Sequence, residues 1–418
     1  MVGMQRTHAP PKWKNRILKP ETPTIKRQHL RDIRSSNRAR ILQVLREPNL
    51  ISRQELAERL ELTPATMSRI SKELIKDGIC EEAPLVRGET QRGRPGVALC
   101  INPKGGFLIA ISISSFSRMI TVIDIAGNQH HQQAIPNHIT AKGPKTVDFV
   151  GKYIDQLIFD NKLDRRLILG AVMTIPGSIN TQSGFLTKSI LLNWPNFAIQ
   201  ERLSERLGCR VRVENNGDAL CRYFMDNNLA RKQRYSSVFL AHISQGMGAS
   251  IAIGERIVRR LADEGWINDI KVSQDTADSP GERKLSDLAS GRSILNTLLK
   301  AKNDITKNGR EFPQMLEAAV TASNHDCDLT RSSFFDAGFQ LGSNLVPLTI
   351  AVAPEVIVLA GPVLQAHAYS EGVSAGYERA ANEMDIKPSR IIVCHASYGD
   401  ASENLALHDF FLTGAYGA

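Results

Sequence analysis

Residues 52–78 read Ser-Arg-Gln-Glu-Leu-Ala-Glu-Arg-Leu-Glu-Leu-Thr-Pro-Ala-Thr-Met-Ser-Arg-Ile-Ser-Lys-Glu-Leu-Ile-Lys-Asp-Gly, which predicts two short helices joined by a tight turn. Ser52, with a glutamate three residues later, has the spacing of a capping box at the start of the first helix. Thr63 can cap the second helix, and Pro64 suits its first position because the missing N–H has no partner there in any helix. Gly78 is expected to end the second helix.

The apolar residues of both predicted helices fall at helical spacing. The predicted core positions are Leu56, Ala57, Leu60, Met67, Ile70, Leu74 and Ile75. The outward face of the second helix carries Ala65, Thr66, Ser68, Arg69 and Lys72. Small, hydroxyl-bearing and basic side chains of this kind can approach base edges and phosphates in a major groove. We therefore expect a helix-turn-helix that binds double-stranded DNA, although an ordinary helical hairpin with a polar face has the same pattern.

The charge distribution supports the DNA-binding interpretation. Residues 1–100 hold 20 of the 52 Lys and Arg residues but only 11 of the 43 Asp and Glu residues, so the whole formal excess of +9 lies there. A basic segment beside a helix-turn-helix is typical of a polyanion partner. The basic tail of residues 1–28 contains four prolines and little apolar periodicity, and we expect it to be disordered.

A wing is predicted after the two helices. Residues 79–86 and 97–101 have the pattern of two short strands around a loop rich in glycine and arginine. From this loop Arg92 and Arg94 could reach backbone phosphates or a narrow minor groove. A plain hairpin with solvated arginines explains the loop equally well.

A further helix is expected over residues 31–46. Its apolar positions are Ile33, Ile41, Leu42, Val44 and Leu45. With this helix the pattern becomes a winged helix-turn-helix DNA-binding domain over residues 29–102. The rest of the chain, residues 103–418, alternates between strand and helix patterns, which predicts an α/β fold. Strand pairs recur near 107–125 and 238–253, consistent with two similar lobes around a cleft.

Other compositional features exclude several classes of protein. No apolar run approaches the roughly 20 residues of a membrane helix, and the basic N-terminus lacks the apolar segment of a secretory signal. The six cysteines are scattered, without a Cys-x-x-Cys pair, which favours reduced thiols. We therefore expect a cytoplasmic protein that does not insert into membranes.

Seven short motifs then suggest a family. They are Gly93-Arg94-Pro95, Ile101-Asn102-Pro103, Ile175-Pro176-Gly177, Asn193-Trp194-Pro195, Val213-Glu214-Asn215, Gly246-Met247-Gly248 and the Leu-Ala-Ser-Gly-Arg run at 288–292. In this order they resemble the ROK family (repressors, open reading frames and sugar kinases) over nearly all of the chain after residue 30. The resemblance implies two actin-like, RNase-H-like ATPase-type lobes and a homodimer or tetramer. For members with this N-terminal domain it also implies sugar-responsive repression of carbohydrate operons.

The chain departs from the family's kinases at three positions. Residues 112–117 read Ser-Ile-Ser-Ser-Phe-Ser where the resemblance implies an acidic and glycine-containing phosphate loop. Asn216 stands where the family's Glu-Asn-Asp triplet has its catalytic Asp, and an amide cannot accept the proton of a sugar hydroxyl. Ala360-Gly361 replaces a Gly-Gly that packs against adenine. These departures argue against phosphoryl transfer, and we expect no enzyme activity.

The family's zinc site also differs. Asp269 takes the place of the zinc-binding His, and no cysteine occurs between Cys221 and Cys327. Residues 271–287 are expected to form a polar loop instead. Although Asp269, Asp275 and Asp278 have the ligand chemistry of a hard-cation site, we interpret them as solvated carboxylates and expect no metal and no cofactor.

The expected effector positions are Asn215, Asn216, Trp266 and Asp269. The resemblance implies that family members hold sugar hydroxyls with the Asn and Asp of the triplet, with a Glu where Trp266 stands, with the His replaced by Asp269, and with a Glu where Ser286 stands. Trp266 could offer a stacking face to a sugar or an aromatic metabolite, or simply fill a collapsed pocket. The sequence thus leaves open whether a sugar or sugar derivative binds here.

The sequence leaves three candidate functions. The favoured one is a DNA-binding transcriptional repressor of carbohydrate or related catabolic genes. A sugar kinase with an accessory DNA-binding domain is disfavoured by Asn216 and by the altered phosphate loop. A regulator controlled by a docked protein instead of a small molecule is the third.

Overall fold

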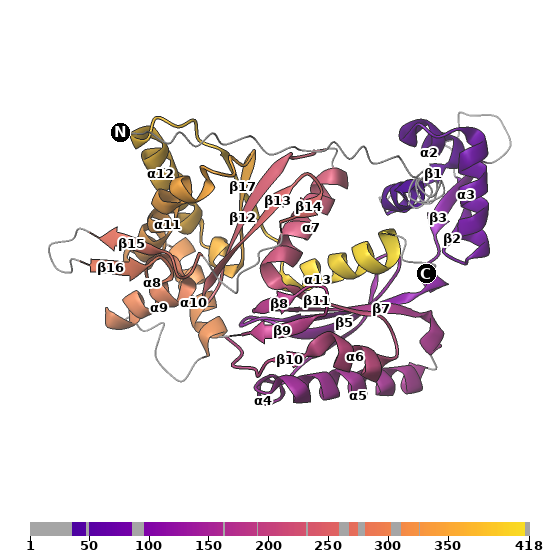
Figure 1. Cartoon of the computed structure of the whole chain (residues 1–418), viewed down its shortest axis with the longest axis horizontal. Helices are drawn as coiled ribbons and strands as arrows, with labels where there is room; N and C mark the ends of the chain where they lie inside the picture. The colour runs from indigo at the N-terminus through magenta and orange to yellow at the C-terminus, as the bar shows by residue number, and fades with distance from the viewer. Residues whose placement is uncertain are drawn as a thin grey trace, which may run out of the picture.

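The structure, a computed structural model, describes residues 36–46, 50–85, 96–161, 164–189, 191–230, 233–258, 267–274, 281–301, 311–325 and 327–413. A winged helix-turn-helix lies at one end of an elongated molecule, and two α/β lobes make up the rest (Figure 1). The part of the chain that the structure describes contains no helix long and apolar enough to span a membrane.

The winged helix-turn-helix forms as predicted where it is described. Its elements are a helix over residues 36–45, β1 (Ile51–Ser52), α2 (Arg53–Leu60), α3 (Pro64–Lys76), β2 (Cys80–Leu85) and β3 (Gly96–Ile101). Ser52 makes the predicted capping box, since its Oγ accepts from the N–H of Glu55 at 3.1 Å while the Glu55 carboxylate accepts from the N–H of Ser52 at 2.9 Å. Thr63 caps α3, and Gly78, at φ +72°, allows the chain to leave it.

The core of this domain is the predicted one. Leu56, Leu60, Met67, Ile70 and Leu74 are buried, whereas Ile75 is only partly covered. The sequence did not predict β1, which pairs with β3 on the side opposite β2. Ile33, Arg92, Arg94 and the tail of residues 1–28 lie outside the described residues.

The first lobe is a five-stranded sheet in the order β11-β7-β4-β5-β6. Its strands are β4 (Phe107–Ile113), β5 (Arg118–Asp124), β6 (Gln129–Ala134), β7 (Ile168–Ile175) and β11 (Val211–Asn215). Beside it lie α4 (Asn137–Thr140), α5 (Gly143–Asn161), α6 (Ile199–Leu207) and a small sheet of β8 (Ser178–Asn180), β9 (Phe185–Lys188) and β10 (Phe197–Ala198). Apolar residues of α5 and α6 cover one face of the large sheet.

The second lobe repeats this plan with the sheet β14-β13-β12-β17-β18. Its strands are β12 (Ser237–Ile243), β13 (Met247–Ile253), β14 (Arg256–Ile257), β17 (Val356–Ala360) and β18 (Arg390–Cys394). Helices α8 (Ser286–Ala289), α9 (Gly291–Lys300), α10 (Phe312–Asn324), α11 (Asp328–Thr349) and α12 (His367–Glu383) pack on its outer face. The α/β alternation and the two strand pairs are therefore confirmed.

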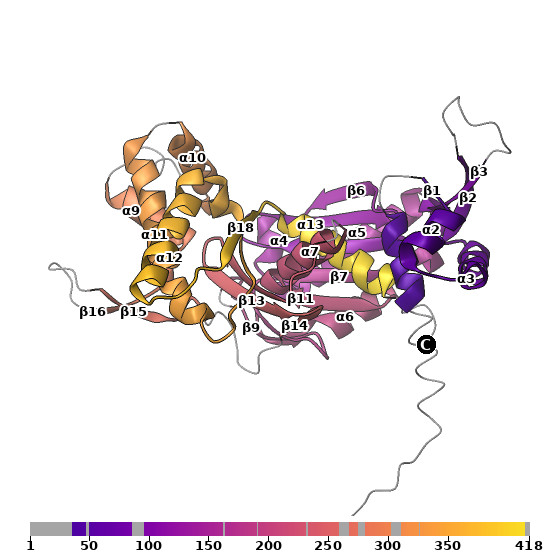
Figure 2. The same cartoon turned by 90° about the horizontal axis from the view of Figure 1, so that it is seen from above.

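Two helices lie in the middle of the molecule and serve both lobes. They are α7 (Asn216–Ala230) and α13 (Tyr398–Leu407), which continues into a π-helical turn at His408–Leu412. Their apolar side chains join one buried core with the inner faces of both sheets. Figure 2 shows α7 and α13 in the centre of the molecule, between the outer helices of the second lobe and the winged helix-turn-helix.

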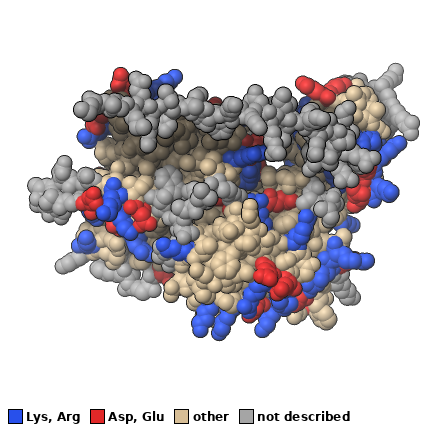
Figure 3. Space-filling view, in the orientation of Figure 1, with Lys and Arg blue, Asp and Glu red and all other residues tan. Residues whose placement is uncertain are grey.

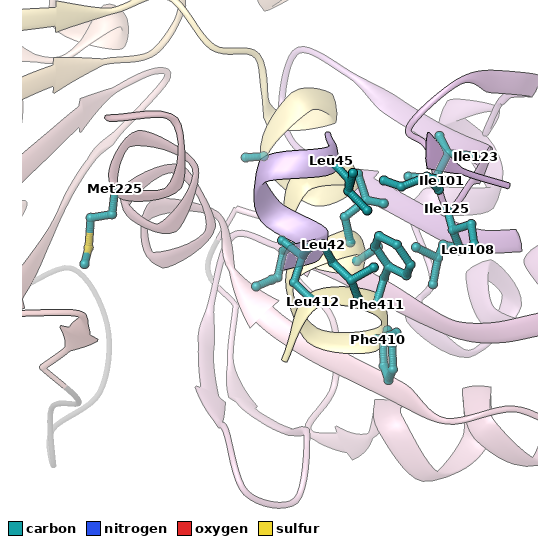
Figure 4. Close-up of a cluster of buried hydrophobic side chains, with 14 of the residues drawn as sticks. Leu42, Leu45, Ile101, Leu108, Ile123, Ile125, Met225, Phe410, Phe411 and Leu412 are labelled. Carbon is teal, nitrogen blue, oxygen red and sulfur yellow. The ribbon is translucent and has the colours of Figure 1, made fainter. Parts of the chain in front are cut away.

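The winged helix-turn-helix shares this central core. Leu42 and Leu45 of the first helix pack toward Phe411 and Leu412, while Ile101 and Ile125 continue the cluster (Figure 4). The connection that follows β3 is also fixed, because the N–H of Asn102 donates to the carbonyl oxygen of Ile79 and its Nδ2 to that of Gly78, both at 2.8 Å. The DNA-binding domain is therefore packed against the lobes.

One sequence prediction in the second lobe was wrong. Residues 271–287 do not form a polar loop, since β15 (Lys271–Gln274) and β16 (Gly281–Lys284) pair as an antiparallel hairpin. Their mostly polar residues lack the apolar alternation that marks a strand, and Val272 is the buried side chain of β15. After this hairpin the chain forms two helices, α8 and α9, which are separated at Ser290, whose extended backbone (φ −82°, ψ 164°) caps α9.

Phe411→Ala should destabilise the whole protein. The Phe411 side chain is fully buried in the core between the first helix and the lobes, and truncating such a side chain costs about 3–5 kcal/mol. Thermal unfolding of the intact chain should show a lowered midpoint. Phe159→Ala on α5 is the matched control, because Phe159 is 80% exposed and its truncation should have an effect within about 0.5 kcal/mol. Equal midpoints for the two variants would contradict the packing described.

Candidate DNA-binding face and interlobe cavity

The outer face of α3 carries the side chains predicted to contact DNA. Ala65, Ser68, Arg69 and Lys72 are exposed, and Lys and Arg side chains stand on the outer edge of the molecule where α3 lies (Figure 3). Arg69 has only a long ion pair, 3.9 Å to Glu73 one turn later, and its side chain is 53% exposed. Its guanidinium is therefore free to reach an external acceptor.

Thr66 has a different environment from its neighbours. It is half-buried, and its N–H and hydroxyl both bond the Oγ1 of Thr63, at 3.3 and 2.9 Å. Thr66 thus belongs to the cap that starts α3. At the far end of the helix, Arg38 donates to the carboxylate of Asp77 at 3.0 Å and joins α3 to the first helix. Both ends of α3 are held while its outer face stays open.

A cavity of about 670 Å³ lies between the two lobes. The first lobe contributes the Ser114–Ser115 turn, the Pro176–Gly177 turn and the Asn215–Asn216 pair at the start of α7. The second lobe contributes the turn after β12, the β15–β16 hairpin and one face of α9. The sequence motifs at 175–177, 213–215, 246–248 and 288–292 therefore meet at one place.

Asn215 and Asn216 play different parts in this cavity. The Nδ2 of Asn215 donates to the carbonyl oxygen of Gly177 at 2.8 Å, and its Oδ1 accepts from the N–H of Gly217 at 2.7 Å. Asn215 is therefore committed to holding the backbone. Asn216 is 3% exposed; its Nδ2 donates to the carbonyl oxygen of Ile113 at 3.0 Å, while its buried Oδ1 has no hydrogen-bond partner among the residues described.

The turn between β4 and β5 is closed on itself. The Oγ of Ser114 accepts from the N–H groups of Phe116 and Ser117 at 3.1 and 2.8 Å, and the N–H of Ser114 donates to the carbonyl oxygen of Ser117. Phe116 then reaches across to Phe312 of the second lobe, with ring centroids 5.5 Å apart. Three backbone N–H groups of this turn, those of Ser114, Phe116 and Ser117, are thus occupied by bonds within the turn and are not free to cradle a phosphate.

Of the two remaining predicted effector residues, Asp269 and Trp266, the structure describes Asp269. Asp269 lies at the cavity but is exposed and paired with Lys284 at 2.6 Å, the two facing each other beside the β15–β16 hairpin. Trp266, Asp275 and Asp278 lie outside the described residues. Within the described ranges no group of three or more His, Cys, Asp or Glu residues lies close enough to hold a metal ion.

The second lobe contributes cavity residues that were not predicted from the sequence. Arg292, Asn296 and Lys300 recur every four residues along α9, and all three line the cavity. Gly291 permits this placement, because its N–H bonds the carbonyl oxygen of Ser244 at 2.9 Å and a Cβ there would lie 2.5 Å from that oxygen. In the sequence the Ser-Gly-Arg run at 290–292 stands out only as a family motif. The four-residue spacing of Arg292, Asn296 and Lys300 is the sequence signal that could have predicted these cavity residues.

The cavity also touches the start of α13. Tyr398 lines it, packed edge to face with His242 at 6.4 Å between centroids. Burial raises the pKa of Tyr398 to about 12, so its hydroxyl stays protonated and keeps its bond to Ser244. From Tyr398, α13 leads directly to Phe411 and Leu412 beneath the DNA-binding domain.

A group of ion-paired side chains, centred on the partly buried Arg212, forms a second connection between the cavity and the C-terminal π-helical turn, in addition to α13. Arg212 bonds the carboxylates of Glu214 at 2.6 Å and of Asp409 at 2.5 Å, and Asp409 also bonds His408. Burial would lower the pKa of Arg212, but the two carboxylates outweigh it and raise that pKa. Glu214 in turn accepts from the N–H of Asn215 at 3.1 Å. The cavity wall and the C-terminal π-helical turn are thus linked through three charged side chains.

Comparison with known proteins agrees with both parts of the molecule. A ROK family profile matches residues 108–406, and a MarR family profile matches residues 35–84. A putative xylose repressor of Caldicellulosiruptor sp. (strain Rt8B.4) is 22% identical over 340 residues, covering 78% of this chain and 83% of the relative. The DNA-binding transcriptional dual regulator NagC of Escherichia coli (strain K12) is 22% identical over 354 residues, covering 80% of this chain and 82% of the regulator.

Solved structures show the same architecture. A ROK family transcriptional regulator described as a homologue of the E. coli MLC protein superposes with a TM-score of 0.68 at 20% identity, covering 91% of this chain and 98% of the other. A ROK family glucokinase from Streptomyces griseus, in complex with glucose and AMPPNP, superposes with a TM-score of 0.57 at 16% identity, covering 72% of this chain and 98% of the other. The chain belongs to the ROK family, and its family domain is preceded by a MarR-type helix-turn-helix.

Proposed function

We propose that this protein is a cytoplasmic, sequence-specific DNA-binding repressor of carbohydrate-utilisation genes. The observation that carries the proposal is the α3 face, where Ser68, Arg69 and Lys72 are exposed on a helix whose opposite face is buried and whose ends are both held. A rigid helix with such side chains matches the recognition helix of helix-turn-helix proteins. The similarity to xylose and N-acetylglucosamine repressors extends over about four-fifths of the chain and supports the regulated gene class.

The two domains divide this function between them. Residues 29–102 read DNA, with Ala65, Ser68, Arg69 and Lys72 at base edges or phosphates and with Arg92 and Arg94 acting from the wing. Thr66 contributes through the cap of α3. Residues 103–418 bind an effector and mediate oligomerisation. A homodimer is proposed because paired recognition helices read paired half-sites.

Sugar phosphorylation is the alternative function, and two features of the site disfavour it. Asn216 presents an amide where a general base would be needed, and its Nδ2 is held by the Ile113 carbonyl oxygen. The N–H groups of Phe116 and Ser117 are bonded to Ser114 and are not free for a phosphate. We therefore propose that the ROK domain acts as a sensor and not as a kinase.

Control by a docked protein is the remaining alternative. The cavity favours a small-molecule effector over it, because about 670 Å³ lies in the range of metabolite sites and many polar side chains line the space. Titration of the protein–operator complex with metabolites distinguishes small-molecule control from protein control. A regulator controlled by a docked protein would not release DNA with any metabolite.

Arg69→Ala should weaken sequence-specific DNA binding. Operator fragments are first selected from genomic DNA with the intact protein, and affinities are then measured for a selected and a scrambled fragment. Loss of a base contact should reduce the preference for the selected fragment by about 1–3 kcal/mol, whereas replacing Arg92 or Arg94 should weaken binding to both fragments and flatten its salt dependence.

Arg202→Ala on α6 is the control for loss of a positive charge. Arg202 is exposed and paired with Asp148 in the first lobe, away from the winged helix-turn-helix. Unchanged discrimination in the Arg69 variant, or an equal loss in the Arg202 variant, would contradict the assignment of α3 as the recognition helix.

Asn216→Asp should not produce a sugar kinase. Restoring a carboxylate supplies a base, but the N–H groups of Phe116 and Ser117 in the β4–β5 turn stay bonded to Ser114 and are not free for a phosphate. ADP release is measured with ATP, magnesium and a panel of hexoses and pentoses, for the wild type and the variant, beside a ROK glucokinase as positive control. Turnover above background by the wild type would overturn the sensor proposal, and turnover by the variant alone would show that the turn accepts phosphate after all.

A further inference from the structure

We propose that a pocket at the C-terminal end of α7 is a second small-molecule site, which takes a compact aromatic cation. The pocket has a volume of about 410 Å³ and, among the described residues, shares no lining residue with the interlobe cavity. It lies between the end of α7, the segment that leads into β12, the β13–β14 turn and Glu355, which precedes β17. A pocket of this size lies in the range of sites for small metabolites.

Part of the pocket lining is apolar. Met225, Tyr235 and Val238 contribute to it, and the Tyr235 ring stacks on that of Phe224, with centroids 5.8 Å apart and 22° between the planes. Met225 stands apart from the other labelled side chains of the central core (Figure 4). Its flexible thioether can adapt to the shape of a bound ring, and aromatic rings favour stacked or edge-to-face partners. This part of the lining therefore suits a flat apolar ligand.

The segments around the pocket are held in place without a ligand. The N–H of Gly254 donates to the carbonyl oxygen of Ser236 at 2.7 Å, and its φ of +59° favours glycine at this turn. The N–H and hydroxyl of Ser236 both donate to Oε2 of Glu355, at 2.8 and 3.0 Å. The N–H of Gln233 donates to the carbonyl oxygen of Asn228 at 2.8 Å. A site whose walls are fixed in advance loses less entropy when a ligand binds.

The charged residues that line the pocket have a net negative charge. They are Arg234, Glu255 and Glu355, and Arg234 already faces Glu255 in a long ion pair of 3.9 Å. The Glu355 carboxylate uses Oε2 for Ser236, while its Oε1 has no hydrogen-bond donor among the residues that the structure describes. A carboxylate accepts charge-assisted bonds from an ammonium group and offers no donor to an anion. The lining therefore favours a cation over an anion of the same shape.

The pocket adjoins a polar contact in the centre of the molecule. Asp226 follows Met225 in α7, and its carboxylate accepts from Asn404 of α13 at 2.9 Å and lies 3.6 Å from Arg222. Its negative charge partly offsets the burial that lowers the pKa of Arg46, at the end of the first helix. A ligand packed on Met225 would therefore act on the turn of α7 nearest the DNA-binding domain. This regulatory consequence rests on the proposed repressor function, whereas ligand binding does not.

The test is isothermal titration of the full-length protein, without DNA, with three compounds that share an indole ring. Indole is neutral, tryptamine is a cation and indole-3-acetate is an anion. We expect tryptamine to bind about two- to fivefold more tightly than indole-3-acetate, the effect of an exposed charge pair. Hydrogen exchange of the tryptamine complex should show protection at residues 223–228 and 253–255. No saturable binding of tryptamine, an affinity no higher than that of indole-3-acetate, or protection confined to other segments would overturn the inference.

Variants assign the ring and the charge of the ligand to separate residues. E355Q should remove the preference for tryptamine, because the amide keeps an acceptor for Ser236 but carries no charge. Y235A should weaken all three compounds about two- to tenfold through loss of the aromatic wall. E383Q is the control, since Glu383 is exposed at the end of α12 and paired with Arg379. An unchanged preference in E355Q or unchanged affinities in Y235A would contradict the site, and the exchange experiment on the wild type tests its location without any variant.

Operator binding tests the regulatory consequence separately. The affinity for a selected operator fragment is measured with and without saturating tryptamine, and we expect it to change about fivefold or more, as for typical coupled sites. An unchanged operator affinity with tryptamine bound would contradict the link between this pocket and the DNA-binding domain. A protein that binds tryptamine but selects no operator would contradict the proposed repressor function and leave the pocket as a binding site, so the two failures are distinguishable.

Discussion

The structure depends on one buried contact, the packing of the first helix of the DNA-binding domain on the C-terminal turn of the chain. Leu42 and Leu45 meet Phe411 and Leu412 in a core that continues without interruption into both lobes. Burial of large apolar side chains is the dominant favourable term in folding, so the DNA-binding domain and the lobes stabilise one another. At the end of the first helix, burial lowers the pKa of the Arg46 guanidinium, and the negative charge of Asp226 on α7 opposes that shift only in part.

This contact places α7 and α13 between the cavity and the DNA-binding domain. Both helices begin at the cavity, at Asn216 and Tyr398, and α13 continues into Phe411 and Leu412 in the core beneath the DNA-binding domain. They are also joined to each other, since Asn404 donates to the carboxylate of Asp226 at 2.9 Å. A shift at the cavity wall would therefore reach the segment on which the first helix of the DNA-binding domain packs, and packed cores transmit such shifts because they have little free volume. The two ROK lobes form the cavity between them, and the N-terminal domain packs on the core that contains the central helices of these lobes.

Much of the fold could be predicted from the sequence, wherever a local rule determines the secondary structure. Capping residues, helical spacing and a left-handed glycine place α2 and α3, and the repeated strand pairs give the two lobes. The β15–β16 hairpin was missed because its polar strands have no apolar alternation, and β1 because two residues carry too little pattern. At the site, Asn215 and Asn216 are identical residues in sequence, yet Asn215 bonds backbone with both ends of its amide, whereas the Oδ1 of Asn216 has no hydrogen-bond partner among the described residues. Only tertiary packing distinguishes these two asparagines. Only tertiary packing also places Arg292 and Lys300 of the second lobe in the wall of the same cavity.

Hydrogen exchange of the intact protein, without DNA or ligand, tests the shared core most directly. The free energy of the opening reaction that exposes each backbone amide is measured for residues 36–45, for α3 and for α13. Segments that unfold together have the same opening free energy. A shared core predicts that the first helix and the 398–412 segment have one common value and open as a unit. Exchange of the whole winged helix-turn-helix at a much lower opening free energy than α13 would show an independently unfolding domain and would contradict the mechanical link between cavity and DNA-binding face.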